Sequence, residues 1–244
     1  MSRLRAGAIA GLLALASVLT AASGSGAADK VGPWEAGKRY RYEYRAAGKP
    51  IGTETFWFER AGEGWSLRDE ADITTDAVGL KAVTAIDLDS SGAPLTAKRR
   101  QQVRSPIPGQ SGLFETAITM EPGKVRIRIL RDESPFWDGD VRVEGRPQVF
   151  DNNFLGALAY ALAKTGAQGD AKLALFHIGA ARVMSLTLGP AQSSIRKVAG
   201  RAITVRARTF SLDGVETGTM GFDERGRLVR YTQGDALEVV LTKP

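Results

Sequence analysis

The residue types that most often carry out catalysis are scarce in this chain of 244 residues. It contains one histidine, His177, and no cysteine. A lone histidine cannot build a site in which several histidines hold a metal, and no thiol is available as a nucleophile. His177 also lies in the apolar segment LALFHIG, where an isolated histidine is usually a hydrogen-bonded structural group. We therefore expect no enzymatic activity and no cofactor.

Two short motifs match those of penicillin-binding enzymes. Ser194 and Lys197 fit the pattern Ser-x-x-Lys, and residues 164–166 have the sequence Lys-Thr-Gly. The two motifs occur in the wrong order, no Ser-Asp-Asn accompanies them, and Ser194 falls on an expected strand. Chance matching explains both motifs better than a catalytic site does.

Residues 87–92, with the sequence DLDSSG, resemble the start of a calcium-binding loop. Oxygen-bearing side chains occupy alternate positions there, and a glycine follows. The twelfth position is Lys98, where such a loop needs a bidentate carboxylate. Because Asp and Ser are also ordinary turn formers, we expect a turn without a metal.

The carboxylates Asp69, Glu70 and Asp72 are the remaining group on which a hydrolase could rest. With one histidine and no cysteine, they would have to supply the acid and base chemistry themselves. We expect them instead on a solvated face of a strand. Hydrolysis is therefore the last of three functional hypotheses.

The elements that would position any site are mostly strands. Segments in which apolar and polar residues alternate recur every eight to twelve residues or so, separated by turn signals such as Asp213-Gly214 and Arg225-Gly226. About a dozen strands are too many for a flat sheet. The sequence predicts a mainly β fold, in which a strongly curved antiparallel meander forms a barrel or half-barrel with one buried or covering helix.

That helix is predicted over residues 149–164, VFDNNFLGALAYALAK. Apolar residues recur there at helical spacing, and alanines leave almost no polar face. Asp151 or Asn152 can cap its start by accepting first-turn N–H groups, and Gly166 can end it. A helix that is apolar nearly all round must be buried.

Aromatic residues alternate along the first two long strands. Tyr40, Tyr42 and Tyr44 share one face, as do Phe56 and Phe58. If these faces are concave, they form an apolar wall opposite the helix. The candidate ligand-binding residues are the aromatic residues of this wall and the apolar helix residues that face it: Tyr40, Tyr42, Tyr44, Phe56, Phe58, Trp65, Phe154, Leu158 and Leu162.

The same residues have a simpler interpretation as the hydrophobic core. Barrels of more than about eight strands enclose more room than their own side chains fill, unless something plugs them. The plug could be the predicted helix or a ligand. The sequence leaves both alternatives open, namely a helix that fills the barrel and one that only covers its mouth.

The N-terminal segment has the pattern of an export signal. Arg3 and Arg5 precede an apolar run over residues 6–22, and small residues allow cleavage near Ala27 or Ala28. We therefore expect a signal peptide over residues 1–28, a single β-barrel-like domain over residues 29–244, and a periplasmic location. Without cysteine, the chain cannot carry a lipid anchor of the lipoprotein type. The net charge of +6 is spread along strands and not gathered in a patch, so we expect no nucleic-acid partner.

Residues 202–241 carry a resemblance to known proteins. Their order of strand, Gly turn, strand ending in an aromatic residue and Asp, Gly-Arg-Leu-Val-Arg strand and apolar strand is similar to a family of exported bacterial proteins of unknown function. Residues 52–56, Gly-Thr-Glu-Thr-Phe, and the Asp-Asn-Asn at residues 151–153 are similar too. The general plan resembles the LolA/LolB periplasmic lipoprotein carriers. The resemblance implies a concave sheet that holds a lipid, and no catalytic residues.

Three hypotheses follow. The first is a non-enzymatic periplasmic protein, expected to be a monomer, that binds or carries a hydrophobic small molecule, lipid or lipidated molecule and transiently contacts a membrane or an envelope protein. The second is an envelope scaffold with a filled barrel and no ligand. The third is the hydrolase.

Overall fold

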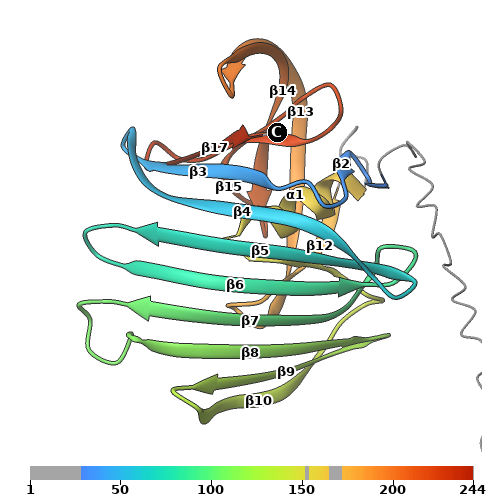
Figure 1. Ribbon diagram of the computed structural model, residues 1–244, viewed down its shortest axis with the longest axis vertical. Coiled ribbons are helices and arrows are strands. Elements are labelled where there is room, and N and C mark those ends of the chain that lie inside the picture. Colours follow the sequence, from blue (N-terminus) through green and yellow to red (C-terminus); the bar gives the residue numbers. More distant parts are fainter. Residues whose placement is uncertain (1–28, 152–153, 165–171, 244) are drawn as a thin grey trace, which may run out of the picture.

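The computed structural model describes residues 29–151, 154–164 and 172–243. Within these ranges the chain forms one helix, two short strands that pair with each other, and a sheet of 15 strands (Figure 1). In chain order the elements are β1 Lys30–Val31, β2 Trp34–Glu35, β3 Tyr40–Ala46, β4 Lys49–Ala61, β5 Gly64–Thr74, β6 Gly79–Leu88, β7 Pro94–Arg104, β8 Gly112–Glu121, β9 Lys124–Arg131, β10 Ser134–Arg142, β11 Gln148–Phe150, α1 Leu155–Lys164, β12 Lys172–His177, β13 Arg182–Val198, β14 Arg201–Leu212, β15 Val215–Phe222, β16 Leu228–Gln233 and β17 Leu237–Lys243. The fold is thus mainly β, as expected, while the predicted signal segment 1–28 lies outside the described residues.

Alternation along the strands explains which face of the sheet is buried. In β3 the side chains of Tyr40, Tyr42 and Tyr44 are buried, whereas Arg41 between them is exposed. Successive side chains in a strand point to opposite faces, so the buried set marks the concave, inner face of the sheet.

The large sheet consists of two meanders. They are joined where β3, the first strand of this sheet in chain order, pairs with β17, the last. The strands β3 to β10 follow one another as neighbours, and β11 to β17 do the same. Every pair is antiparallel except β11 with β12. The outermost strands β10 and β11 are not paired with each other in the described residues. The barrel is therefore open, and the half-barrel alternative describes it.

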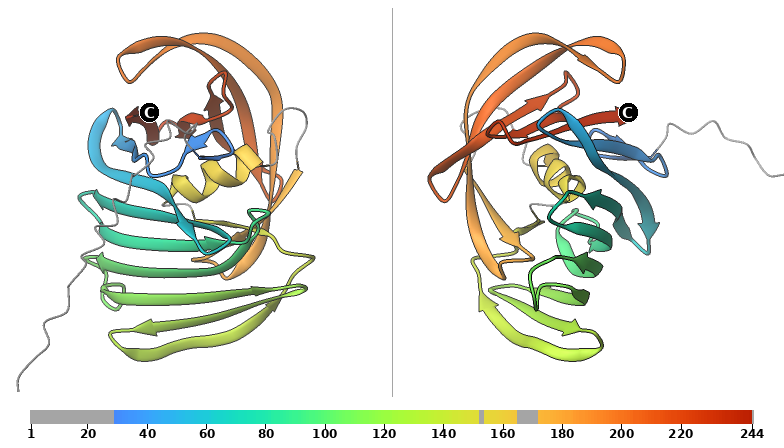
Figure 2. Two further views of the ribbon diagram at one scale, coloured as in Figure 1. Left: turned by 45° about the vertical axis from the view of Figure 1, so that its right-hand side comes forward. Right: turned by 90° about the vertical axis from the view of Figure 1, so that its left-hand side faces the viewer.

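Helix α1 connects the two parallel strands β11 and β12, which need a crossover between them. Figure 2 shows it inside the curve of the sheet. All eight residues from Leu155 to Leu162 are buried, so the helix fills this part of the barrel. Among the described residues, no helix is both long and apolar enough to cross a membrane.

The helix begins later than the sequence predicts. Val149 and Phe150 belong to β11, where they pair with Phe176 and His177 of β12. These two apolar residues pair with a strand that is distant in the sequence. The spacing of apolar residues along one segment gives no information on such a pairing. The predicted capping residue Asn152 and the predicted end at Gly166 lie outside the described residues.

Two further segments differ from the expectation. Residues 182–198 form one long strand with a bulge between Leu188 and Ala191, where the sequence predicts two strands. Residues 134–142 form the edge strand β10, where the sequence predicts a loop at Pro135, Phe136 and Trp137 followed by a short strand near residues 141–144. The β13–β14 hairpin arches over the top of the molecule (Figure 2).

The hydrophobic core is built around Phe56. The rings of Tyr40 and Tyr42 stack on it at centroid distances of 5.4 and 5.6 Å. Trp34 of β2 packs edge-on against Phe56 at 5.0 Å, so the N-terminal hairpin closes this side of the core. The turns after β5, β7 and β9 lie on the side of the sheet away from this hairpin, on the left in Figure 1. We call this side the loop edge.

Candidate functional site

Three polar side chains lie next to one another on the inner face of β5, β6 and β7. The register places Asp69 opposite Thr84, and Thr84 opposite Arg99. Directly opposed side chains on neighbouring strands have Cβ atoms about 5 Å apart. The three residues are only 3%, 4% and 6% exposed. We call Asp69, Thr84 and Arg99 the polar row.

Glu54 of β4 lies diagonally beside the polar row and is completely buried. Its carboxylate accepts the N–H of Leu155 at 2.9 Å, the N–H of Gly156 at 2.5 Å and the hydroxyl of Tyr44. The two N–H groups are donors that the first turn of a helix leaves unpaired. Glu54 therefore caps α1 from a neighbouring strand, and the positive end of the helix dipole stabilises its negative charge.

Asp69 lies against the same first turn of the helix. A Cβ atom at Gly156 would be 2.7 Å from Asp69 Oδ2 and 2.9 Å from Cβ of Phe56, which explains the glycine. Neither carboxyl oxygen of Asp69 has a hydrogen-bond partner among the described residues. Burial, reinforced by the negative charge of Glu54, raises the pKa of Asp69 well above its usual value. Asp69 therefore keeps its proton at pH values where an exposed aspartate has lost it.

Arg99 is held from two sides. Its Nη1 pairs with the buried carboxylate of Asp151, and its guanidinium lies over the Phe154 ring at 4.4 Å. Its Nε, like the hydroxyl of Thr84, has no hydrogen-bond partner in the described part of the chain. The polar row thus presents a donor at Arg99 and groups at Thr84 and Asp69 that can both donate and accept.

His177 is close to this network but is already hydrogen-bonded. Its Nδ1 accepts the N–H of Ala180 at 2.8 Å, and its ring packs edge-on against Phe150 at 5.2 Å. Burial lowers the pKa of His177, so the ring is neutral at pH 7. These contacts fit the expected structural role of this histidine.

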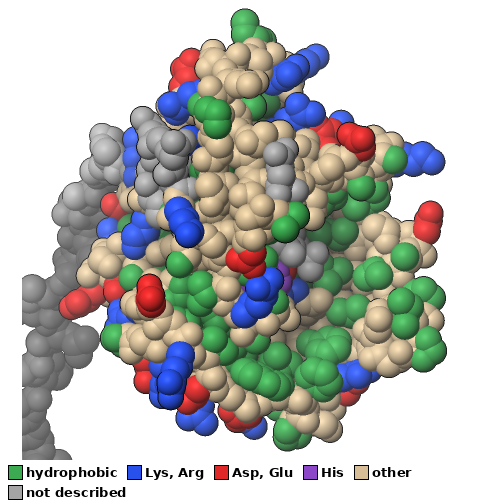
Figure 3. Space-filling model, turned by 180° about the vertical axis from the view of Figure 1, so that it is seen from behind, with side chains coloured by type: hydrophobic (Ala, Val, Ile, Leu, Met, Phe, Trp, Pro, Cys, Tyr) green, Lys and Arg blue, Asp and Glu red, His purple; other side chains and the backbone are tan. Residues whose placement is uncertain are grey.

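On the loop-edge side of the polar row, the inner face is half-buried and mostly apolar, with the polar side chains of Gln101 and Arg131 beside Phe114. Phe154 packs there on Ala71, Leu80 and Ala82, and so separates the polar row from the residues nearer the edge. We call these inner-facing residues the open wall: Ile73, Val103, Phe114 and Ile129. Figure 3 shows hydrophobic side chains gathered around a hollow on this concave side.

Several large hydrophobic side chains are exposed at the loop edge itself. Val78 and Trp137 are each 37% exposed, Ile107 53% and Phe136 59%. The Phe136 ring packs edge-on against Phe114 of the open wall at 6.0 Å. An exposed aromatic ring at the surface is therefore in contact with one on the inner face. We call Val78, Ile107, Phe136 and Trp137 the rim.

Seven of the nine predicted site residues belong to one packed core cluster and Trp65 packs against it, whereas Phe154 packs separately on Ala71, Leu80 and Ala82. Eight of the nine are at most 2% exposed. Trp65, the ninth, is half-buried beneath the guanidinium of Arg60, 3.9 Å above its ring. These side chains occupy the interior themselves, and so this part of the barrel corresponds to the filled alternative. Their role in binding a ligand stays a prediction.

Sequence reasoning missed the polar row and Glu54. Glu70 and Asp72 are exposed, as expected, but Asp69 points to the inner face. Its position between Leu67 and Ala71 in the alternation was the available signal. The same alternation places Arg99 and Glu54 on the inner face.

The catalytic and metal motifs are explained by local structure. Ser194 is half-buried and Lys197 is exposed, both on strand β13. Asp89 accepts the N–H groups of Ser91 and Ala93, both at 2.9 Å, and so forms the expected turn. In the described ranges no group of three or more acidic, His or Cys side chains is arranged to hold a metal ion.

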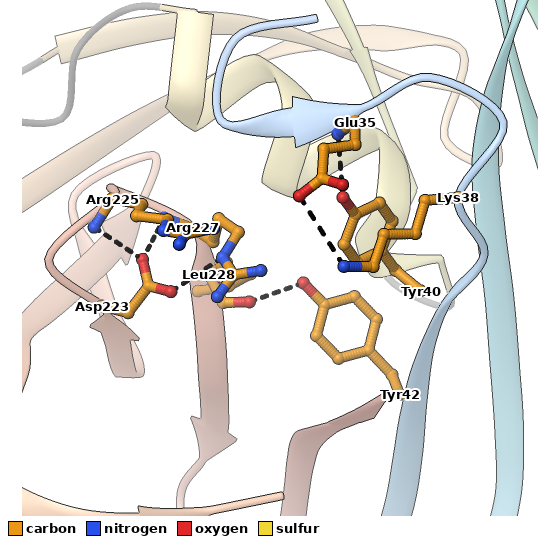
Figure 4. Close-up of polar contacts among 8 residues, drawn as sticks. All are labelled: Glu35, Lys38, Tyr40, Tyr42, Asp223, Arg225, Arg227 and Leu228. Carbon is orange, nitrogen blue, oxygen red and sulfur yellow. Dashed lines mark hydrogen bonds and ion pairs between the residues drawn. The ribbon is translucent and has the colours of Figure 1, made fainter. Parts of the chain in front are cut away.

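A second cavity, a groove of about 900 Å³, lies between the β13–β14 hairpin and the turn after β15. Figure 4 shows its polar contacts. Asp223 accepts the N–H groups of Arg225 and Arg227 at 3.0 and 2.9 Å and pairs with Nε of Arg227 at 2.8 Å. Tyr42 donates to the carbonyl of Leu228 at 2.7 Å. The polar groups next to this groove thus hydrogen-bond to one another and stabilise the turn after β15 and the start of β16.

No protein-family model and no curated protein matches the chain. One solved structure is similar, the crystal structure of a β-barrel-like protein of the domain of unknown function DUF1849 from Brucella abortus, with a TM-score of 0.51. The similarity covers 84% of this chain and 95% of that chain at 14% sequence identity.

At this identity the similarity concerns the fold alone. It confirms the expected likeness to a β-barrel family of unknown function at that level, whereas likeness to the LolA/LolB carriers is not shown. The chain has a β-barrel-like architecture that also occurs in a protein of unknown function.

Proposed function

We propose that this protein is a non-enzymatic periplasmic protein that binds or carries a hydrophobic molecule, such as a lipid or a lipidated molecule, inside its curved sheet. The observation that carries the proposal is the open wall, a set of apolar side chains on the inner face that the rest of the protein leaves half-exposed. Soluble proteins rarely leave such faces uncovered without a binding role. The pattern of residues 1–28 supports the periplasmic location.

The proposed site is thus nearer the loop edge than the predicted aromatic wall. Phe154 is shared between the two, since it packs on Ala71 and Ala82 below the open wall. The remaining aromatic residues form the packed wall behind it. Carriage of lipoproteins in the manner of LolA/LolB is one form of this function, supported by the general plan of the fold.

Mass spectrometry of solvent extracts from the purified protein tests the proposal. We expect a co-purifying apolar molecule in the wild type and its loss in an Ile129→Asp variant, which introduces a charge into the open wall. Val83→Asp is the matched control, because Val83 is a 56% exposed residue on the outer face. Extracts without any such molecule, together with no binding of the neutral apolar dye Nile red, would contradict the proposal.

The filled interior around α1 favours a second candidate, an envelope scaffold that works through its surface. The exposed Ile195 and Val215, at 74% and 69%, would then contact a partner. Pull-down from envelope extracts should recover one defined partner, and aspartate substitutions at both positions should abolish its recovery while leaving Nile red binding unchanged.

A further inference from the structure

The polar row has unused hydrogen-bonding capacity inside the barrel. Three residues on neighbouring strands carry buried polar atoms without a partner in the described part of the chain, namely Oδ1 and Oδ2 of Asp69, Oγ1 of Thr84 and Nε of Arg99. Buried polar atoms are nearly always paired, and each exception needs an explanation. Because the three residues with unpaired buried atoms are direct neighbours across the strands, one bound group is the simplest explanation for all of them.

The neighbouring groups explain only part of this gap: the protonated Asp69 interacts with Glu54, but Oγ1 of Thr84 and Nε of Arg99 have no partner among the described residues. Glu54 accepts three donors from Tyr44, Leu155 and Gly156. Asp151 pairs with Arg99 Nη1. A guest that completes the polar row must therefore accept from Arg99 Nε and exchange hydrogen bonds with Thr84 and Asp69.

The charges of the network determine the kind of guest. Glu54 and Asp151 carry negative charges and Arg99 one positive charge, while Asp69 is protonated and His177 neutral. An anion would add to an existing negative excess in a low-dielectric interior, and a cation would lie against the guanidinium. An uncharged group that both donates and accepts, such as a hydroxyl or an amide, fits all three positions.

We propose that the polar row binds the uncharged hydroxyl or amide head of an amphiphile whose hydrocarbon chain lies along the open wall. This inference rests on the proposed function and adds the chemical class of the ligand. Phe154 lies between the head site and the open wall, in contact with Arg99 on one side and Ala82 on the other. Its ring must move aside when the head enters.

Probes of equal chain length that differ only in the head test the proposal. Dodecanol and dodecanamide carry neutral heads, dodecanoate is an anion and dodecyltrimethylammonium a cation. Displacement of Nile red at pH 7, at probe concentrations below micelle formation, reports the affinity of each. We expect the neutral probes to bind the wild type at least about tenfold more tightly than either charged probe, because a charged head would have to be buried beside a charge of its own sign.

The Thr84→Val variant removes the central hydroxyl while keeping the size of the side chain. It should weaken dodecanol and dodecanamide about fivefold to tenfold and leave Nile red binding unchanged. Asp69→Asn keeps an uncharged donor and acceptor and should retain the neutral preference. Thr119→Val, at an exposed position on the outer face of β8, is the matched control and should change nothing.

Two outcomes would overturn the inference in distinguishable ways. Equal affinities for all four heads, unchanged in Thr84→Val, would show that the row holds only water, while Nile red binding would leave the proposed function standing. Failure of Nile red and of every probe to bind the folded wild type would remove the proposed function and this inference together.

Discussion

Asp69 is the residue whose chemistry is most altered by the fold. It is a carboxylic acid in an apolar interior, next to a second carboxylate that is fully hydrogen-bonded to a helix N-terminus. Of the two neighbouring acids, Glu54 accepts the N–H groups of the helix, whereas Asp69 accepts from no donor in the described part of the chain and lies against Glu54. Burial and the neighbouring carboxylate raise the pKa of Asp69, so it stays a neutral acid at pH values where an exposed aspartate has ionised.

The Asp69→Asn variant should change how stability depends on pH. Below about pH 4, Asp69 is protonated in both the folded and the unfolded protein. Above it, the unfolded state loses the proton and the folded state keeps it, because the folded-state pKa is raised. The unfolding free energy of the wild type therefore falls with rising pH, by up to about 1.4 kcal/mol per pH unit from this group.

Asparagine cannot ionise, so the variant lacks this fall. Urea unfolding at several pH values between about 5 and 8 should show the variant gaining stability relative to the wild type as the pH rises. Parallel curves for the two proteins would contradict the raised pKa of Asp69.

The sequence predicts which face of the sheet a side chain occupies, but it does not predict which residue that side chain contacts. The alternation Leu67, Asp69, Ala71 identifies Asp69 as inward-facing, although its acidic neighbours Glu70 and Asp72 drew attention to a solvated face. The contact between Glu54 and Leu155 spans 101 positions. Such a contact depends on where the helix lies within the curved sheet, and no local pattern encodes that.

At the scale of elements, α1 depends on a cap supplied by another strand. The sequence predicts a local cap at Asp151 or Asn152, because such residues commonly accept first-turn N–H groups. In the structure Asp151 pairs with Arg99, and Glu54 of β4 accepts the N–H groups of Leu155 and Gly156. The existence and burial of the helix followed from its apolar residues, whereas its start depended on pairing between β11 and β12.

Removal of this cap should destabilise the protein strongly. Glu54→Ala leaves the N–H groups of Leu155 and Gly156 and the hydroxyl of Tyr44 without their acceptor inside the protein. We expect a loss of about 3 kcal/mol or more in unfolding free energy, because each orphaned buried donor costs about 1 kcal/mol or more. Glu70→Ala, at a residue that makes an exposed ion pair with Arg39, should change it by less than about 0.5 kcal/mol. Similar losses in both variants would argue against the cap.

Gly156 provides a test in which helix propensity and packing predict opposite signs. Alanine is favoured over glycine by about 1 kcal/mol inside a helix. A Cβ at Gly156 would, however, lie 2.7 Å from Asp69 Oδ2 and 2.9 Å from Phe56 Cβ. We expect Gly156→Ala to lower the thermal midpoint, with a cost of about 1–3 kcal/mol from overpacking. Ala163→Gly, at a half-buried position of α1, should cost about 1 kcal/mol by propensity alone, and a stabilised Gly156→Ala variant would show that the contact is loose.

At the scale of the whole molecule, the two halves of the sheet differ in how they are filled. The half around β3, β4 and β17 holds α1 and the aromatic core, and the half from β7 to β10 leaves the open wall half-exposed. The strand count predicted strong curvature. It could not predict whether β10 and β11 pair, since a closed and an open barrel use the same alternation along each strand, and that difference separates a sealed interior from an accessible one.

If ligands enter past the loop edge, the rim should control their rate of entry. Phe136, 59% exposed, packs against Phe114 of the open wall, so the two rings offer an incoming chain a continuous apolar contact. Phe136→Asp removes apolar area worth about 1–2 kcal/mol to a passing hydrocarbon. Stopped-flow fluorescence should show Nile red associating about tenfold more slowly with this variant. Ile195→Asp on the distant β13–β14 hairpin, at a residue 74% exposed, should leave the association rate unchanged. An equal slowing in both variants would show that the rim has no special part in entry, and slowing only in Ile195→Asp would place the entrance beneath the hairpin.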